Sequence, residues 1–219
     1  VGFPIPGGRA LRIGLADGLP DPRVYAVAAG RGQVYFGTWA GIGALVDSGE
    51  RLRVRRIAPA FADRTLALAA AGDTLGVGTR HGPGRGVPEA ADLVEAGGWG
   101  SSVRFRKPVV ALSWRGDTLV ALTEDEMLWR DPASGGWTEG PVLSSIVGPI
   151  RAAVDDQHGL WVAGARGTGF VRLGGPVERP LLVGDALPGA PNDLAVDDRY
   201  LWVATDRGLV RFALDYIRP

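Results

Sequence analysis

A short apolar pattern returns five times along this chain and constrains the fold more than any other feature. Each copy alternates apolar and small residues and usually ends in Thr, as in residues 200–205. The equivalent anchor positions are Val34, Leu75, Leu119, Leu160 and Leu201. Their spacings are 41, 44, 41 and 41 residues. A period of about 40–45 residues with several short strands per unit is typical of a β-propeller. Helical solenoids of similar period are excluded, because the repeated core alternates with period two.

Each unit can be divided into four strands. An Ala-rich stretch before the anchor suits an innermost strand, since small side chains fit around a narrow central channel. The anchor strand is second, and a Gly-bearing turn leads to a third strand, clearest in Gly208–Phe212. The fourth strand is the most polar, as in Arg53–Ile57. We therefore expect an all-β fold, a five-bladed β-propeller with four antiparallel strands per blade, in a single domain over residues 1–219.

The two ends of the chain suggest how such a ring would close. The last unit stops at Pro219 after its third strand, while the N-terminus supplies an additional apolar stretch, Ala10–Gly14. We expect this N-terminal strand to pair beside Gly208–Phe212 and to complete the last blade. Closure by strands from both termini would remove the two free sheet edges that invite aggregation.

Composition excludes several classes of function. Lys+Arg and Asp+Glu both number 24, so the formal net charge is zero. The chain therefore lacks the long-range electrostatic field that a general nucleic-acid binder uses. The absence of Cys excludes thiolate catalysis, disulfides and cysteine-ligated metals. His81 and His158 are the only histidines, and the strand directions place them at opposite ends of their blades, which argues against a shared site. No apolar run of 18 or more residues is long enough for a transmembrane helix.

The last two repeats resemble a known family. Residues 192–212, NDLAVDDRYLWVATDRGLVRF, are similar to the repeat of the bacterial two-component-regulator propellers. The matching residues are Leu201, Trp202, Val203, Thr205, Gly208, Leu209 and Arg211. A looser copy contains Leu160, Trp161, Val162, Gly169 and Arg172. The resemblance implies the propeller fold and, as in that family, a place in sensor regions of membrane-bound signalling proteins.

No catalytic motif is readable. There is no P-loop, no G-x-S-x-G elbow and no calcium loop in the sequence. The pairs Asp155-Asp156 and Asp197-Asp198 end inner strands, where Asp caps turns through the backbone, although five-bladed glycosidases use inward acids. The basic stripe Arg53–Arg56 is expected to be an ordinary charged edge. We therefore predict no enzyme activity, no cofactor and no metal site.

The candidate site is one loop face. In an up-and-down blade, the loops between the second and third strands emerge on the same side as the linkers between blades. We predict that a partner meets this side, through a few aromatic and arginine anchors. The residues assigned to it are Trp39, Arg80, His81, Glu124, Asp125, Arg166, Asp206 and Arg207.

These observations favour a non-catalytic binding propeller, an accessory or extrinsic subunit that docks on a protein partner in a larger complex. Two alternatives stay open: a propeller that senses a small ligand or carbohydrate, and a glycosidase-like five-bladed enzyme. We expect a protein partner and no nucleic acid, and the sequence allows peripheral association with a membrane complex. A bacterial, extracytoplasmic (periplasmic) location is favoured over a cytoplasmic one.

Overall fold

The computed structural model describes residues 13–30, 32–47, 52–57, 64–72, 74–86, 93–94 and 107–219, and in these ranges the protein is all-β with three short helices. The strands are β1 (Val24–Gly30), β2 (Gln33–Thr38), β3 (Gly41–Asp47), β4 (Leu52–Ile57), β5 (Thr65–Ala71), β6 (Thr74–Thr79), β7 (Gly82–Gly86), β8 (Leu93–Val94), β9 (Ala111–Arg115), β10 (Thr118–Leu122), β11 (Glu126–Arg130), β12 (Trp137–Val142), β13 (Ile150–Asp156), β14 (Gly159–Gly164), β15 (Gly167–Val171), β16 (Val177–Leu182), β17 (Pro191–Val196), β18 (Tyr200–Thr205) and β19 (Gly208–Ala213). The helices are η1 (Leu15–Asp17), α1 (Ser144–Val147) and α2 (Leu214–Ile217).

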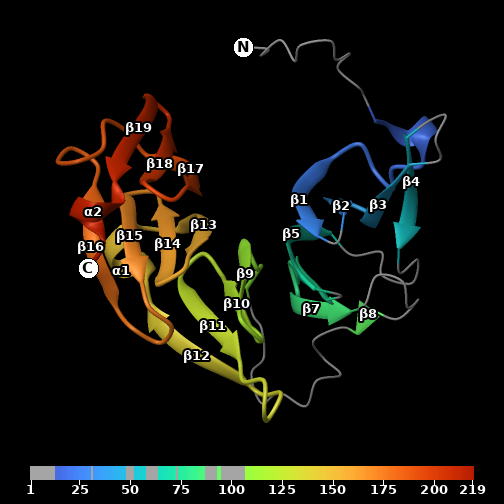
Figure 1. Ribbon diagram of the computed structural model, residues 1–219, viewed down its shortest axis with the longest axis horizontal. Coiled ribbons are helices and arrows are strands. Elements are labelled where there is room, and N and C mark those ends of the chain that lie inside the picture. Colours follow the sequence, from blue (N-terminus) through green and yellow to red (C-terminus); the bar gives the residue numbers. More distant parts are fainter. Residues whose placement is uncertain are drawn as a thin grey trace.

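The strands form five antiparallel sheets, and in each one the strands follow one another in chain order. We name them sheet 1 (β1–β4), sheet 2 (β5–β8), sheet 3 (β9–β12), sheet 4 (β13–β16) and sheet 5 (β17–β19). The first strand of each sheet contacts the first strand of the next: β1 with β5, β5 with β9, β9 with β13 and β13 with β17. The sheets are therefore arranged around a common axis with their first strands innermost (Figure 1). The predicted all-β architecture of repeated antiparallel sheets is confirmed.

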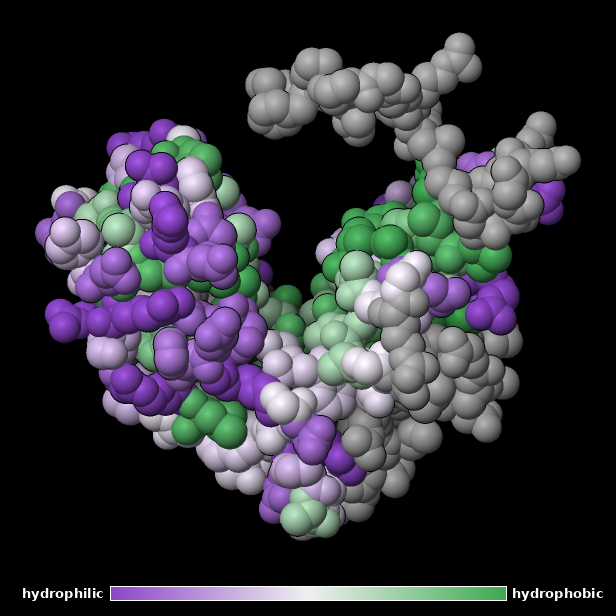
Figure 2. Space-filling model, in the orientation of Figure 1, coloured by the Kyte–Doolittle hydropathy of each residue, from purple (hydrophilic) through white to green (hydrophobic). Residues whose placement is uncertain are grey.

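The described sheets do not form a closed ring. Sheet 1 and sheet 5 stand at opposite ends of an arc, and a gap separates them (Figure 1). The space-filling view shows a hollow between these two ends (Figure 2). Closure is the part of the predicted architecture that the described residues do not show.

The predicted closing strand falls mostly outside the described residues, which begin at Ile13. Its described part, Ile13 and Gly14, is not in a strand. The Gly14 carbonyl accepts from the backbone N–H groups of Asp17 and Leu19, and the η1 turn so formed contacts β4 of sheet 1. Among the described residues, β19 pairs with β18 alone. At Gly14 the prediction is corrected, because the local turn uses the backbone groups that a ladder with β19 would need, while residues 10–12 of the predicted strand lie outside the described residues.

Apolar side chains fill the spaces between neighbouring sheets. Between sheets 4 and 5, the fully buried Trp161 and Phe170 contact each other edge to face, with 5.2 Å between their ring centroids, and they pack with Leu201 and Val203. The side chains of helix α2 join this cluster through Leu214. Similar clusters lie between the other adjacent sheets. Because sheets 2, 3 and 4 each bury one face against the sheet before and the other against the sheet after, the repeat period sets the core.

The Thr that ends most repeats has a structural function. In sheet 5, the Thr205 hydroxyl donates to the Gly208 carbonyl at 2.8 Å and accepts from the Arg207 N–H at 3.1 Å. The hydroxyls of Thr38 and Thr79 make the same two bonds in sheets 1 and 2. This side-chain bond closes the tight turn between the second and third strands, as Ser and Thr commonly do.

Sheet 4 is the exception, with Gly164 at the Thr position. A Cβ there would lie 2.5 Å from the carbonyl oxygens of both Val147 and Gly148. These two residues belong to the linker around α1, whose backbone passes directly over the turn. Glycine is needed at this position because the linker occupies the space of a side chain.

Candidate functional site

All eight predicted site residues lie in the turns between the second and third strands. Backbone hydrogen bonds tie these turns to the linkers between sheets: Trp39 N–H donates to the Arg23 carbonyl at 3.1 Å, and Asp206 N–H to the Ala190 carbonyl at 3.1 Å. In sheet 4, Ala165 N–H donates to the Pro149 carbonyl, also at 3.1 Å. Turns and linkers thus form one surface, which we call the turn face. The turns between first and second strands form the opposite surface, the hairpin face.

Trp39 is the centre of a cation–aromatic cluster on the turn face. The guanidinium carbons of Arg23 and Arg64 lie 4.3 and 4.7 Å from its ring centroid. Tyr25 lies beside it at 6.4 Å, and Arg64 also lies 4.5 Å from the Tyr25 ring. Trp39 remains 41% exposed. Each contact of this kind contributes about 0.5–1 kcal/mol at exposed sites, so the indole is held in a fixed orientation while presenting a large apolar surface.

The Asp21 carboxylate holds the Arg23 side chain in this position. Its guanidinium forms two bonds with the Asp21 carboxylate, at 2.8 and 3.0 Å. This pairing, with a backbone N–H bond from Arg23, lowers the pKa of Asp21 to about 2. The carboxylate is therefore ionised throughout the physiological range, and it keeps Arg23 against Trp39.

A second group of predicted residues meets around helix α1. Arg166 donates to the carbonyl of Ser144 at 2.9 Å and to the carbonyl of Ser145, both in α1. The Asp125 carbonyl accepts from Leu143 N–H at 2.7 Å and from Ser144 N–H at 3.0 Å. Asp125 also forms an ion pair with Lys107, which lowers the pKa of the aspartate. The structure thus brings Asp125 and Arg166 to one short helix.

The remaining predicted residues lie in the corresponding turns of sheets 2, 3 and 5. Arg80 and His81 are exposed in the β6–β7 turn, where His81 N–H donates to the Thr79 hydroxyl at 3.0 Å. Asp206 and Arg207 occupy the equivalent turn of sheet 5. Glu124, exposed before β11, uses its backbone carbonyl to accept from Ile150 N–H at 2.7 Å. The two groups on the turn face whose contacts are described are the one around Trp39 and the one around α1.

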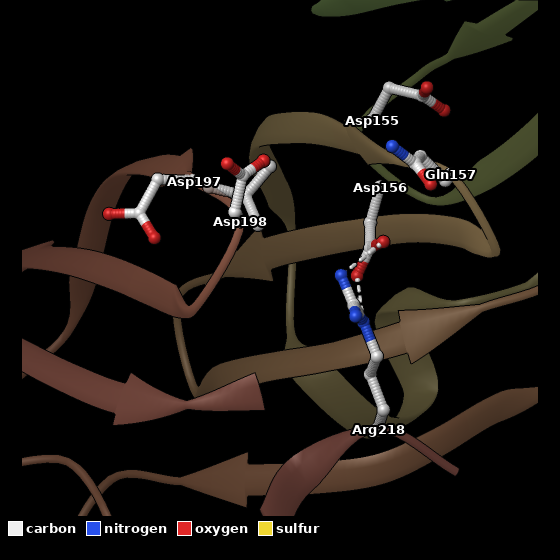
Figure 3. Close-up of a pocket in the computed structure, with 7 residues that line it drawn as sticks. Asp155, Asp156, Gln157, Asp197, Asp198 and Arg218 are labelled. Carbon is white, nitrogen blue, oxygen red and sulfur yellow. Dashed lines mark hydrogen bonds and ion pairs between the residues drawn. The ribbon is translucent and has the colours of Figure 1, made fainter. Parts of the chain in front are cut away.

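Sequence reasoning missed a second feature, a pocket of about 410 Å³ on the hairpin face. It lies between the hairpins of sheets 4 and 5 and is lined by Asp155, Asp156, Gln157, Val196, Asp197, Asp198 and Arg218 (Figure 3). Arg218 follows helix α2 and reaches back from sheet 5, so that its Nε and Nη2 donate to the two carboxylate oxygens of Asp156 at 2.9 and 2.8 Å. The conspicuous signal was the Asp-Asp pair in both hairpins, but nothing local indicated that Arg218 would join them.

Most polar groups of this pocket are already engaged. The Asp156 side chain is buried and also accepts from the Trp161 indole N–H at 3.2 Å. Asp197 accepts from the Trp202 indole at 2.8 Å and from two backbone N–H groups of its own turn, and these bonds lower its pKa. Turn capping by Asp197, expected from the sequence, is thus observed.

Asp155 is held from the neighbouring sheet. Arg115, at the end of β9, donates to its carboxylate at 2.6 Å and to the carbonyls of Asp156, Gln157 and Gly159. Burial nevertheless raises the pKa of Asp155. Arg115 therefore links the β13–β14 hairpin of sheet 4 to sheet 3.

Within the part of the chain that the structure describes, no group of three or more His, Cys, Asp or Glu side chains is arranged to hold a metal ion. A search of the same residues for a helix long and apolar enough to span a membrane found none.

Comparison with known proteins shows the fold class. No model of a known family matches the chain, and no curated protein matches it. Among solved structures, it is similar to the extracellular domain of a hybrid two-component system from B. thetaiotaomicron, with a TM-score of 0.71, 17% identity, 90% of this chain covered and 27% of that chain. It is also similar to PorZ, a bacterial surface component of the type-IX secretion system of Porphyromonas gingivalis (TM-score 0.63, 14% identity, 90% and 25% covered).

A third similar structure is the WD40 β-propeller domain of Doa1, with a TM-score of 0.66, 12% identity, 89% of this chain covered and 66% of that chain. The chain spans about a quarter of the length of the two bacterial proteins. At these identities the likeness concerns the fold alone. The protein is an all-β chain of propeller architecture, and the resemblance of its last two repeats to two-component propellers has a counterpart among its structural neighbours.

Proposed function

We propose that the protein is a non-catalytic binding propeller that docks a protein partner on its turn face. The observation that carries this proposal is the Trp39 cluster, an exposed indole fixed between two guanidinium groups and next to Tyr25. Trp, Tyr and Arg are the residue types that dominate binding energy at protein interfaces. Because the cluster is ordered before binding, little side-chain entropy is lost when a partner covers it.

The surroundings of the cluster support a protein ligand rather than a small molecule. The α1 group adds a second anchor on the same face, with Ile146 partly exposed beside the Arg166 bonds. Two separated anchors on one surface suit a broad partner. The two bacterial structures that resemble this chain are an extracellular domain and a surface component, which supports an extracytoplasmic location for this protein as well.

The test is purification of the tagged full chain from its source, with cross-links mapped in the complex. We expect a stoichiometric partner that is retained by the wild type and lost with Trp39→Ala, since truncation of an interface anchor costs about 2 kcal/mol or more, roughly 30-fold in affinity. Tyr216→Ala is the matched control, because Tyr216 is an exposed aromatic on α2, near the hairpin face. Cross-links confined to the outer strand Leu52–Ile57 or to the hairpins would contradict the proposal.

A second candidate is the sensing of a small ligand in the hairpin-face pocket. The observation in its favour is a pocket whose carboxylates come from two sheets. We rank it second because Asp156 and Asp197 already hold protein partners. A thermal-shift screen of amines and sugars tests it, and a ligand whose stabilising effect disappears in Asp198→Ala would support it.

A further inference from the structure

The outer strand of sheet 1 carries three exposed arginines. Strand β4 is the last strand of this sheet and lies on the outside of the arc (Figure 1). Arg53, Arg55 and Arg56 are exposed, whereas Val54 and Ile57 are buried. Arg53 and Arg55 project from the same face of the strand, and at a rise of about 3.4 Å per residue their Cα atoms lie about 7 Å apart. We call the three arginines the arginine stripe.

The charges of the stripe are not neutralised by the residues that the structure describes. In this part of the chain, none of the three guanidinium groups forms an ion pair. Across the β3–β4 ladder, Arg53 is paired with Val46 and Arg55 with Ala44, so their cross-strand neighbours are apolar. The stripe therefore keeps three positive charges at the surface.

The outer strand of sheet 4 shows the opposite arrangement. Glu178 is a charged residue of β16, and Arg172 donates from Nη1 to its carboxylate at 2.6 Å. The charge of Glu178 is thus neutralised within its own sheet. Sheet 1 leaves the corresponding counter-charges to be supplied from elsewhere.

Protection of an open sheet edge does not account for the stripe. Charged side chains often serve this purpose where the backbone groups of an outer strand are unpaired. Here the η1 turn contacts β4, and a Cβ at Gly18 would lie only 2.2 Å from the Val54 carbonyl oxygen. Arg56 also donates from Nη2 to the Pro20 carbonyl at 3.4 Å. The chain itself covers the middle of this edge, so edge protection leaves three arginines unexplained.

An exposed apolar residue belongs to the same surface. Leu15 is in η1 and is 62% exposed. Because η1 contacts β4, the surface beside the stripe combines an aliphatic side chain with three cations. Arginine together with apolar contact area is typical of protein-binding surfaces, where charges determine the register and orientation of the partner.

Charge complementarity favours an acidic polypeptide as the occupant. A guanidinium group can bind a carboxylate through two parallel N–H bonds. Carboxylates at alternate positions of an extended segment are about 7 Å apart, which matches the spacing of Arg53 and Arg55. Anionic membranes are commonly recognised by clusters of about four to eight basic residues, and DNA-binding proteins often contact about six to ten phosphates. A stripe of three arginines is small for either of these surfaces.

We propose that the arginine stripe and Leu15 form an interface for an acidic segment of a partner protein. Its carboxylates bind Arg53 and Arg55, and an apolar side chain packs on Leu15. Since the chain covers the edge at Val54, recognition uses side chains rather than the addition of a strand. The interface includes no residue of the Trp39 cluster, so it stands whether or not that cluster binds a partner.

The first experiment measures binding of fluorescein-labelled decaglutamate to the purified full chain by fluorescence anisotropy. We expect binding that weakens as salt is added, since salt screens exposed charges. Affinity should fall about 10-fold or more in Arg53→Glu/Arg55→Glu, because two attractive contacts become repulsive. The matched control is Arg179→Glu/Arg199→Glu, which changes the net charge equally at exposed sites on sheets 4 and 5 and should keep the affinity within about 2-fold.

Three results would overturn the proposal: no binding of decaglutamate, an equal loss in both double variants, or no loss in either. Stripe-dependent binding that is tighter to vesicles of equal parts phosphatidylcholine and phosphatidylserine, or to oligothymidine, would also overturn it in favour of a membrane or a nucleic acid. If Arg53→Glu/Arg55→Glu does not fold, Arg53→Gln/Arg55→Gln replaces it, with Arg179→Gln/Arg199→Gln as its control.

The second experiment identifies the occupant. The photoreactive residue p-benzoylphenylalanine replaces Leu15 in the full chain in its source organism. We expect cross-links to segments of another protein in which two Asp or Glu side chains lie within four positions of each other. These cross-links should be lost with Arg53→Glu/Arg55→Glu and kept with Trp39→Ala, which separates this proposal from the turn-face one. Cross-links to lipid, to nucleic acid, to a second copy or to segments without such carboxylates would overturn the proposal, as would none.

Discussion

Replacement of Gly164 by Thr tests whether the linker, rather than the repeat pattern, determines the residue at the end of β14. The repeat pattern predicts that Gly164→Thr stabilises the protein, because Thr at this position closes the turn in sheets 1, 2 and 5. The structure predicts the opposite. A Cβ at Gly164 would lie 2.5 Å from two backbone carbonyl oxygens, a separation that real Cβ atoms do not adopt, so the linker has to move.

The expected cost follows from what the linker contributes. Overpacking of this kind costs about 1–3 kcal/mol. Displacing the linker also strains the 2.7 Å bond from Arg166 N–H to the Val147 carbonyl and the 3.1 Å bond from Ala165 N–H to the Pro149 carbonyl, each worth about 1 kcal/mol. We expect Gly164→Thr to lower the free energy of unfolding by about 2–4 kcal/mol, and the melting temperature by roughly 5–15 °C.

The assay is urea unfolding followed by tryptophan fluorescence, together with thermal unfolding. Gly164→Ala should show most of the loss, because the first added carbon already makes the close contact. Gly14→Ala is the control, since nothing lies within 4 Å of a Cβ at Gly14 and its stability should change little. An unchanged or raised melting temperature for Gly164→Thr would refute the reasoning.

Three further results are expected. Trp161→Ala should cost about 3–5 kcal/mol in denaturant melts, whereas Trp202→Ala, at the equivalent position on the open face, should cost less than half as much. Arg218→Ala should cost about 3 kcal/mol by the same measurement, because it leaves the buried Asp156 carboxylate without its cation, while Arg218→Lys should recover part of the loss. The folded-state pKa of Asp197 is lowered, so the bonds to its carboxylate stabilise the fold above the unfolded pKa of about 3.9. This contribution is lost as the pH falls through the folded-state pKa. Between pH 6 and pH 3 the melting temperature of Asp197→Asn should therefore decrease less than that of the wild type.

The sequence contained enough information to predict the sheets and their turns. The anchor spacing correctly placed the second strand of each sheet. Leu75, Leu160 and Leu201, for example, all lie in the strands expected for them. The tight turns were equally readable: the Asp197 carboxylate accepts two backbone N–H groups, as turn chemistry requires. Both kinds of feature depend on residues close together in the chain, so a local pattern specifies them.

The candidate site was predictable only in part. The direction of the strands was sufficient to place Trp39 and Arg166 on one face. The partners that orient Trp39 could not be predicted in this way, because Arg64 lies just before β5 of the next sheet and no spacing relates it to Trp39. The contact of Arg218 with Asp156 spans 62 residues, and it depends on how α2 folds back after β19. Long-range contacts of this kind come from the curvature of the arc, which no single repeat encodes.

Ring closure marks the limit of repeat-based reasoning. Leu209 and Met127 occupy equivalent positions, and both are apolar, so their sequences predict the same burial. Met127 is buried because sheet 4 covers it, whereas nothing among the described residues covers Leu209. Burial at the terminal sheets is therefore a property of the neighbour and not of the strand. In this structure both terminal sheets keep such positions exposed, Val27 in sheet 1 and Leu209 in sheet 5, because a gap separates these two sheets.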